Sequence, residues 1–245
     1  MNREIVWKGN NHTNSSSRGT HVPFVIVNHI SAGTMASMDS WFTSPGNKTS
    51  SAHFGVAKDG RIHQYVDIRR MAWANGIGAE DIAKSKTPVI QDNPGINPNL
   101  YSVSIEHEGT DGDLTEAQFQ ASVWLHRYIQ QQVQEIWGRV FELDRYHVIG
   151  HFQVNPRGKP SCPGSKFPWN RLYKELLEVE KKEDDTLKLE TWQWKMLGDT
   201  LDGLYRKGVI GDYSWAEKAY TGKLTASELA WLNTVIFARQ AGVEV

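Results

Sequence analysis

A run of six charged residues, Glu180 to Asp185, most constrains what this chain can fold into, because the sequence changes character across it. Charge runs of this kind are typical of solvated segments, either a linker or the exposed end of a helix. We therefore predict a first domain over residues 1–180, a charged linker over residues 181–185 and a small all-α domain over residues 186–245. The 245 residues of the chain are enough for one medium domain and one small one.

The last segment, residues 186–245, lacks proline and holds four of the ten tryptophans. Apolar residues recur at helical spacing between Leu189 and Leu204 and again between Leu229 and Ile236. A capping signal at Thr225 precedes the second stretch. We expect two or three helices, whose tryptophans form either the core of a small bundle or a contact between two copies of the chain, a homodimer.

Strand and helix signals alternate along residues 1–180. A nearly continuous apolar run, Val22 to Asn28, predicts a buried strand that ends at His29. The alternating segment Tyr101 to His107 predicts a second strand, with Glu106 and His107 on opposite faces. The other expected elements are a helix over 35–42, a hairpin over 52–66, a long surface loop over 74–99, a helix over 114–137, a short strand over 146–150 and a helix over 167–179.

Composition excludes several classes of function. With 27 basic and 28 acidic residues the net charge is −1, so the broad positive field that non-specific nucleic-acid binding needs is absent. One cysteine excludes an intrachain disulfide framework. No apolar run approaches the ~20 residues that cross a bilayer. The first residues, Met1 to Lys8, have no apolar signal-peptide core, so we expect synthesis in the cytoplasm.

Three possible metal ligands, His29, His151 and Cys162, lie next to expected element ends. Two imidazoles and one thiolate, with a fourth position open to water, are a plausible ligand set for catalytic zinc. Such an ion lowers the pKa of bound water towards ~7 and polarises a carbonyl oxygen. However, a single histidine is more often structural, and nine histidines offer many accidental trios, so composition alone does not select these three.

The sequence around these residues does select them. Five short segments occur in order: VIVNH ending at His29, SAHF around His53, AWANG at 72–76, SIEHEG around Glu106, and GH at His151 followed ten residues later by CPG. Together they resemble the zinc-dependent N-acetylmuramoyl-L-alanine amidase family, which includes phage endolysins, bacterial autolysins, recycling amidases and peptidoglycan recognition proteins. The resemblance covers roughly residues 20–180.

The resemblance implies an α/β fold, with a mixed central sheet flanked by helices and a zinc ion (Zn²⁺) bound by His29, His151 and Cys162 at a groove. The implied reaction is hydrolysis of the amide between N-acetylmuramic acid and the L-alanine of the peptidoglycan stem peptide. A cysteine as the third ligand is similar to the endolysin and recognition-protein branches, whereas the recycling enzymes use aspartate there.

The same resemblance gives roles to two further residues. Glu106 matches the catalytic glutamate, which acts as general base and then as general acid. Lys159 is suited to stabilise the oxyanion, although in much of the family this lysine lies two residues before the third ligand, where this chain has Pro160. Glu108 shares a strand face with Glu106, so we expect its charge to raise the pKa of Glu106. His53, which follows the start of the expected hairpin, is expected to line the groove, and His107 is expected to pack in the interior. Neither is expected to bind zinc.

The main hypothesis is a lytic amidase of phage or prophage origin, an endolysin that is made without a signal peptide and acts on a cell wall of the Gram-positive type after release. One alternative is a non-catalytic peptidoglycan-binding protein, although such proteins typically lack a metal ligand. Another is a zinc peptidase that cuts within the stem peptide. For residues 186–245, wall targeting joins oligomerisation as an expected role.

Overall fold

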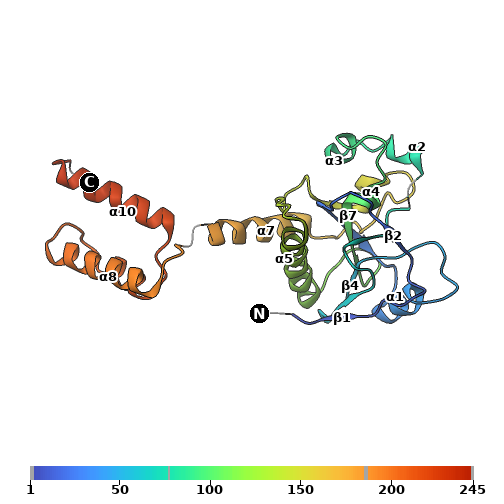
Figure 1. The fold of residues 1–245 in the computed structure, drawn as a ribbon, viewed down its shortest axis with the longest axis horizontal. Coiled ribbons are helices and arrows are strands. Elements are labelled where there is room, and N and C mark those ends of the chain that lie inside the picture. Colours follow the sequence, from blue (N-terminus) through green and yellow to red (C-terminus); the bar gives the residue numbers. More distant parts are fainter. Residues whose placement is uncertain (1–2, 77, 185–186, 244–245) are drawn as a thin grey trace. The chain divides into compact units, whose positions relative to one another are not determined.

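The computed structural model describes residues 3–76, 78–184 and 187–243. The chain forms two compact units, Met1–Leu177 and Glu178–Val245 (Figure 1). Helix α7 (Trp169–Asp184) crosses this division. The charged linker expected over 181–185 falls on the last turn of α7 and on Asp185, which lies outside the described residues. The domain limits at 180 and 186 therefore stay a prediction.

The first unit contains a mixed six-stranded sheet. Its spatial order is β1 (Ile5–Trp7), β5 (Ile62–Gln64), β4 (Phe54–Val56), β7 (Ser102–His107), β3 (Val25–Ile30) and β8 (Val148–Gly150). Strands β4 and β5 form the expected antiparallel hairpin, whereas the pairs β4–β7, β7–β3 and β3–β8 are parallel. A small antiparallel sheet joins β2 (Ser15–Ser17) to β6 (Arg70–Ala72).

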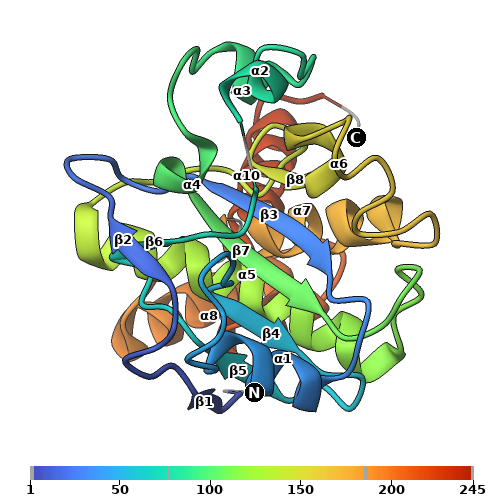
Figure 2. The ribbon, with the colours of Figure 1, turned by 90° about the vertical axis from the view of Figure 1, so that its right-hand side faces the viewer.

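The two faces of this sheet have different roles. On one face the side chains of Asn28 and His107 meet helix α5 (Glu116–Trp137), where they contact His126 and Ser122 at 3.1 and 2.8 Å. Figure 2 shows α5 behind the sheet. Because side chains alternate along a strand, the adjacent residues His29 on β3 and Glu106 on β7 point to the opposite face. The mixed sheet with flanking helices confirms the expected α/β fold.

Most expected elements of the first unit are present. Helix α1 (Met35–Phe42) has the bounds that the sequence predicts, and its capping box at Thr34 explains its start. The expected surface loop over 74–99 was wrong in part, because it contains α2 (Ala79–Ile82), α3 (Pro88–Gln91) and the start of α4 (Pro98–Tyr101). Within it, Val89 and Ile90 are buried in the main core. The prolines that suggested a loop instead open two of these helices, a position where proline is favoured.

The second unit contains α8 (Thr191–Arg206), α9 (Ser214–Tyr220) and α10 (Ala226–Gln240). Helical periodicity predicts the first and the last of these, and the total agrees with the expected two or three helices. Thr225 caps α10 through a capping box with Glu228. Aliphatic residues form its core: Leu201, Ile210, Ala216, Ala219, Leu224 and Leu232. Trp192 and Trp231 are 63 % and 55 % exposed, so a core role for these two was wrong.

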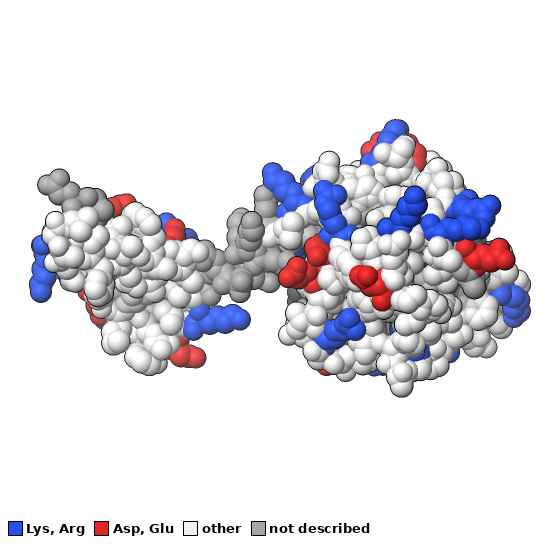
Figure 3. All heavy atoms as spheres, turned by 90° about the horizontal axis from the view of Figure 1, so that it is seen from above, with Lys and Arg blue, Asp and Glu red and all other residues white. Residues whose placement is uncertain are grey.

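The surface agrees with the nearly neutral charge of the sequence. Basic and acidic side chains both occur on the face shown in Figure 3. Among the described helices, none is both long and apolar enough to cross a bilayer.

Candidate metal centre and catalytic groove

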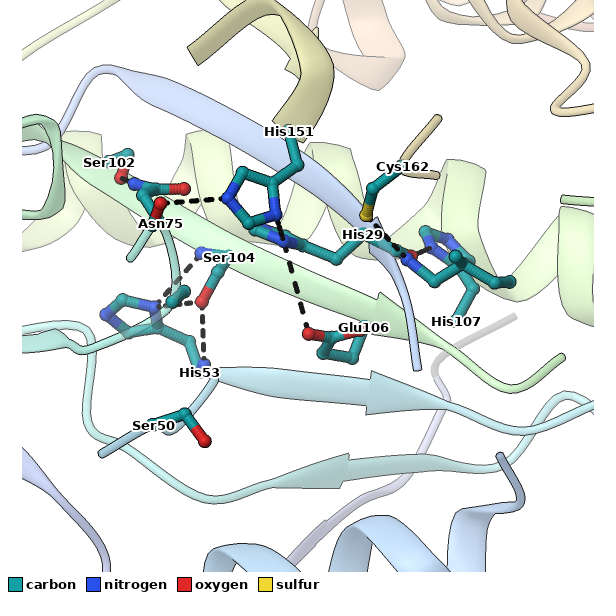
Figure 4. Close-up of polar contacts among 12 residues, drawn as sticks. His29, Ser50, His53, Asn75, Ser102, Ser104, Glu106, His107, His151 and Cys162 are labelled. Carbon is teal, nitrogen blue, oxygen red and sulfur yellow. Dashed lines mark hydrogen bonds and ion pairs between the residues drawn. The ribbon is translucent and has the colours of Figure 1, made fainter. Parts of the chain in front are cut away.

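The parallel pairing of β3 with β8 brings two histidines to the same edge of the sheet. His29 lies near the end of β3, and His151 begins α6 (His151–Val154) directly after β8. Cys162 approaches from the loop that follows α6 (Figure 4). One ligand atom from each of these three residues lies within 4.8 Å of the others. The three residues that the sequence singled out therefore form one cluster.

Hydrogen bonds orient two of these ligands. The Nε2 atom of His151 lies 2.9 Å from the carbonyl oxygen of Asn75. A carbonyl only accepts hydrogen bonds, so Nε2 carries the proton and Nδ1 keeps its lone pair. The backbone N–H of Ile30 donates to the Cys162 sulfur at 3.4 Å, a contact that favours a thiolate. The free lone pair of His151 is thus available to a metal ion.

The donor set fits a divalent cation of intermediate softness. The Nδ1 atoms of His29 and His151 are 2.9 Å apart, with the sulfur of Cys162 beside them. Two imidazole lone pairs at this distance repel unless a proton or a cation lies near both. Imidazole and thiolate together are ligands that zinc prefers.

Burial keeps both imidazoles in the neutral form that metal binding requires. It lowers the pKa of His29 well below its usual value, with the nearby His151 adding to the effect. It lowers the pKa of His151 to about 4. Burial raises the pKa of the Cys162 thiol to about 12, against the opposing effect of the Ile30 N–H, so a bound cation must displace the thiol proton.

Glu106 lies beside this cluster because it pairs with His29 in the parallel ladder between β3 and β7. Its Oε1 is 4.0 Å from Nδ1 of His29, and its side chain is 16 % exposed. Burial raises the pKa of Glu106 to about 7, while the charge of Lys159 acts in the opposite direction. The expectation that Glu108 raises this pKa was wrong, because burial accounts for the rise. A Glu108 carboxylate oxygen instead accepts the backbone N–H of Lys58 at 2.8 Å.

A groove of about 530 Å³ opens over the cluster. His29, His151, Cys162, Glu106 and Lys159 all line it, together with residues of α1 and the loops around it. The shifted spacing of Lys159 therefore still allows its side chain to border the groove.

Two tryptophans also line the groove. The side chains of Trp41 and Trp73 are 49 % and 38 % exposed. The indole N–H of Trp41 donates to the Ser50 hydroxyl at 2.8 Å, and that of Trp73 donates to the Ser16 hydroxyl at 3.0 Å. Sequence reasoning overlooked both as groove residues, although Trp73 lies in the AWANG segment.

The other two histidines near the site lie outside the ligand cluster, as expected. His53 is buried, and its Nδ1 lies 3.0 Å from the Ser104 hydroxyl, so it does not border the groove (Figure 4). His107 lies on the α5 side of the sheet, with Nδ1 3.0 Å from the carbonyl of His29. Sequence reasoning missed the Asn75 carbonyl and the Ile30 N–H, because main-chain atoms leave no residue-type signal.

A mixed sheet that presents two imidazoles, a thiolate and a buried carboxylate at one groove is typical of metal-dependent hydrolases. Residues 18–165 match the family model for N-acetylmuramoyl-L-alanine amidase. Since this match spans more than half of the sequence, the chain belongs to the N-acetylmuramoyl-L-alanine amidase family of enzymes.

Individual relatives agree with this assignment. N-acetylmuramoyl-L-alanine amidase A of Achromobacter lyticus is 27 % identical over 184 residues, which cover 69 % of this chain and 92 % of the relative. The 1,6-anhydro-N-acetylmuramyl-L-alanine amidase AmpD of Enterobacter cloacae is 26 % identical over 144 residues, covering 58 % and 66 %. A crystal structure of AmpD shares the fold with a TM-score of 0.52 at 22 % identity, covering 71 % of this chain and 96 % of that one.

Proposed function

We propose that the protein uses zinc to hydrolyse the amide between N-acetylmuramic acid and L-alanine in peptidoglycan. The observation that carries this proposal is the convergence of ligand atoms from His29, His151 and Cys162 at a groove that Glu106 and Lys159 also line. When bound there, zinc would lower the pKa of a water molecule and polarise the scissile carbonyl.

Glu106 is the proposed general base and acid. Its carboxylate takes a proton from the attacking water as the water oxygen bonds to the lactyl carbonyl carbon. It then gives this proton to the nitrogen of L-alanine as the C–N bond breaks. The products are a muramic acid carboxyl group and a stem peptide with a free amino terminus. A pKa of about 7 suits both directions of transfer near neutral pH.

Lys159 is the proposed oxyanion stabiliser. Its ammonium group supplies positive charge at the groove, and the direction in which it shifts the pKa of Glu106 reflects that field. Trp41 and Trp73 supply exposed aromatic faces on which sugar rings of the glycan stack. A polymeric wall of the Gram-positive type is the substrate that we propose, with a phage or prophage endolysin as the origin.

The test is zinc content together with product chemistry. The purified protein is expected to hold about one zinc ion per chain and to release L-alanine amino termini from isolated sacculi until a chelator is added. His29→Ala, His151→Ala or Cys162→Ala should remove both zinc and release.

The products also separate the alternatives. Zinc without release of amino termini would indicate a peptidoglycan-binding protein, and new amino termini on residues other than L-alanine would indicate a peptidase. A parent protein that binds no zinc would contradict the proposed metal centre.

A further inference from the structure

Arg18 is a buried cation that the proposed reaction does not use. Its side chain is 2 % exposed, and burial lowers its pKa to about 9, so it still carries a charge at neutral pH. Burying a guanidinium is costly unless its donors are satisfied.

All three guanidinium nitrogens of Arg18 make hydrogen bonds. Nε donates to the carbonyl of Ile68 at 2.8 Å. The first terminal nitrogen donates to the carbonyls of Asn99 and Leu100, at 2.9 and 2.7 Å. The second donates to the carbonyl of Ser102 at 2.8 Å. One side chain thus ties together the segment before β6, helix α4 and the first residue of β7.

Two of these tied residues hold Asn75, one at its backbone and one at its side chain. The side-chain oxygen of Asn99 accepts the backbone N–H of Asn75 at 3.0 Å. The hydroxyl of Ser102 accepts from the side-chain amide of Asn75 at 3.2 Å (Figure 4). The carbonyl of Asn75 in turn accepts from Nε2 of His151. A continuous path of hydrogen bonds therefore links Arg18 to a metal ligand.

From this path we infer that Arg18 is a positioning residue for the metal centre: by fixing Asn99 and Ser102 it holds the Asn75 carbonyl where it sets the proton and ring orientation of His151. Partners that orient a ligating histidine typically change metal affinity 10- to 100-fold when lost. Lysine cannot replace Arg18, because an ammonium group lacks the planar fork that reaches several carbonyls at once. The inference rests on the proposed zinc site and extends it.

The test measures zinc affinity of the full chain without substrate. Arg18→Lys removes the fork and keeps the charge. Asn99→Ala removes the side-chain oxygen that holds the backbone of Asn75, so it cuts the branch next to the Asn75 carbonyl, while the Asn99 carbonyl that Arg18 binds and the branch through Ser102 remain. Val133→Ala, in the core on the α5 side, serves as control for general destabilisation. Zinc dissociation constants come from chelator competition, melting temperatures rank the stability of each variant, and the visible spectrum of the cobalt form reports ligand geometry.

We expect Arg18→Lys and Asn99→Ala to weaken zinc binding by about 10- to 100-fold and to alter the cobalt spectrum. Val133→Ala should lose stability with zinc affinity unchanged. Parent-like zinc affinity in Asn99→Ala, or an equal loss in Val133→Ala, would overturn the inference and leave the proposed function standing. If Arg18→Lys fails to fold, Asn99→Ala alone decides. A parent protein without zinc affinity would overturn the metal centre and this inference together.

Discussion

Burial, rather than a neighbouring negative charge, sets the acidity of Glu106. The carboxylate sits on the sheet face opposite α5, beside His29, and its pKa rises to about 7 because water is largely excluded. Without Lys159 the shift would be larger, since that ammonium group favours the charged form. The two effects together keep a carboxyl group able to accept and return a proton near neutral pH.

This origin of the pKa predicts a pH profile. A general base acts when deprotonated, so kcat/KM should rise with pH through about 7 and then level off. Glu106→Gln should keep zinc, lose about 10²- to 10⁴-fold in kcat and lack this rise. Hydrolysis of a soluble muramoyl peptide from pH 5 to 9 measures both.

Glu108→Gln is the matched control, because its carboxylate binds the Lys58 backbone. Its profile should keep the midpoint of the parent protein. A displaced midpoint in this control would mean that charge repulsion from Glu108 raises the pKa of Glu106. Parent-like rates in Glu106→Gln would mean that Glu106 is not the general base.

At the scale of elements, the loop that carries Cys162 depends on a close approach between backbones. Gly164 has a φ of +117°, and a Cβ there would lie 2.1 Å from the carbonyl of Asp111. Only glycine fits such a contact, since L side chains rarely adopt this φ and would overlap the neighbouring chain. The CPG segment thus positions the thiol ligand through a residue that has no side chain.

Gly164→Ala should therefore displace the Cys162 loop and weaken zinc binding, with stability reduced by about 1–3 kcal/mol from backbone strain alone. Gly138→Ala is the control, because Gly138 also has a positive φ, +68°, but has open space around it. It should lose about 1–2 kcal/mol and keep parent zinc affinity. Chelator competition and thermal melts compare the two, and equal zinc affinity in both variants would contradict the role given to the close contact.

Local signals predicted many of these elements, and non-local contacts account for most of what was missed. Apolar runs and turn residues suffice for β3, the hairpin and α1, because neighbours in sequence decide them. Strand order depends on pairings between distant segments, so the sequence predicted none, and the family resemblance implied only a mixed sheet. The buried Val89 and Ile90 show the limit, since their surroundings in sequence are polar and rich in turn residues.

The candidate site was likewise predictable only in part. The three ligands and Glu106 were found through residue types in a recognisable order. The path from Arg18 to Asn75 was not, because it runs through backbone carbonyls and through a side chain whose burial sequence position does not reveal.

At the scale of the whole molecule, each of the two units has its own hydrophobic core. In the second unit, Trp192, Trp231 and Phe237 are 63 %, 55 % and 75 % exposed. Aromatic faces of this kind bind sugar rings or a second protein copy. We propose wall targeting as the role of the second unit, with a homodimer contact as the alternative.

Truncation after Asp184 tests this proposal. The shortened chain should hydrolyse soluble muramoyl peptides at the parent rate, because every groove residue precedes Asp184. On intact sacculi it should lose about 10²-fold or more in apparent affinity, since a second binding module raises effective concentration. Sedimentation of both chains is the companion measurement. A full chain that dimerises, with sacculus binding equal to that of the shortened chain, would favour the homodimer.

The group that orients His151 is a main-chain atom, and this has a consequence for how the site tolerates genetic change. No single codon substitution at position 75 deletes a carbonyl oxygen, so the contact survives exchanges that keep the local backbone in place. A mutational scan should therefore find Arg18 and Asn99, whose hydrogen bonds hold that backbone, among the positions that tolerate few substitutions. We therefore expect the residues most sensitive to mutation to include some that lie outside the three candidate metal ligands.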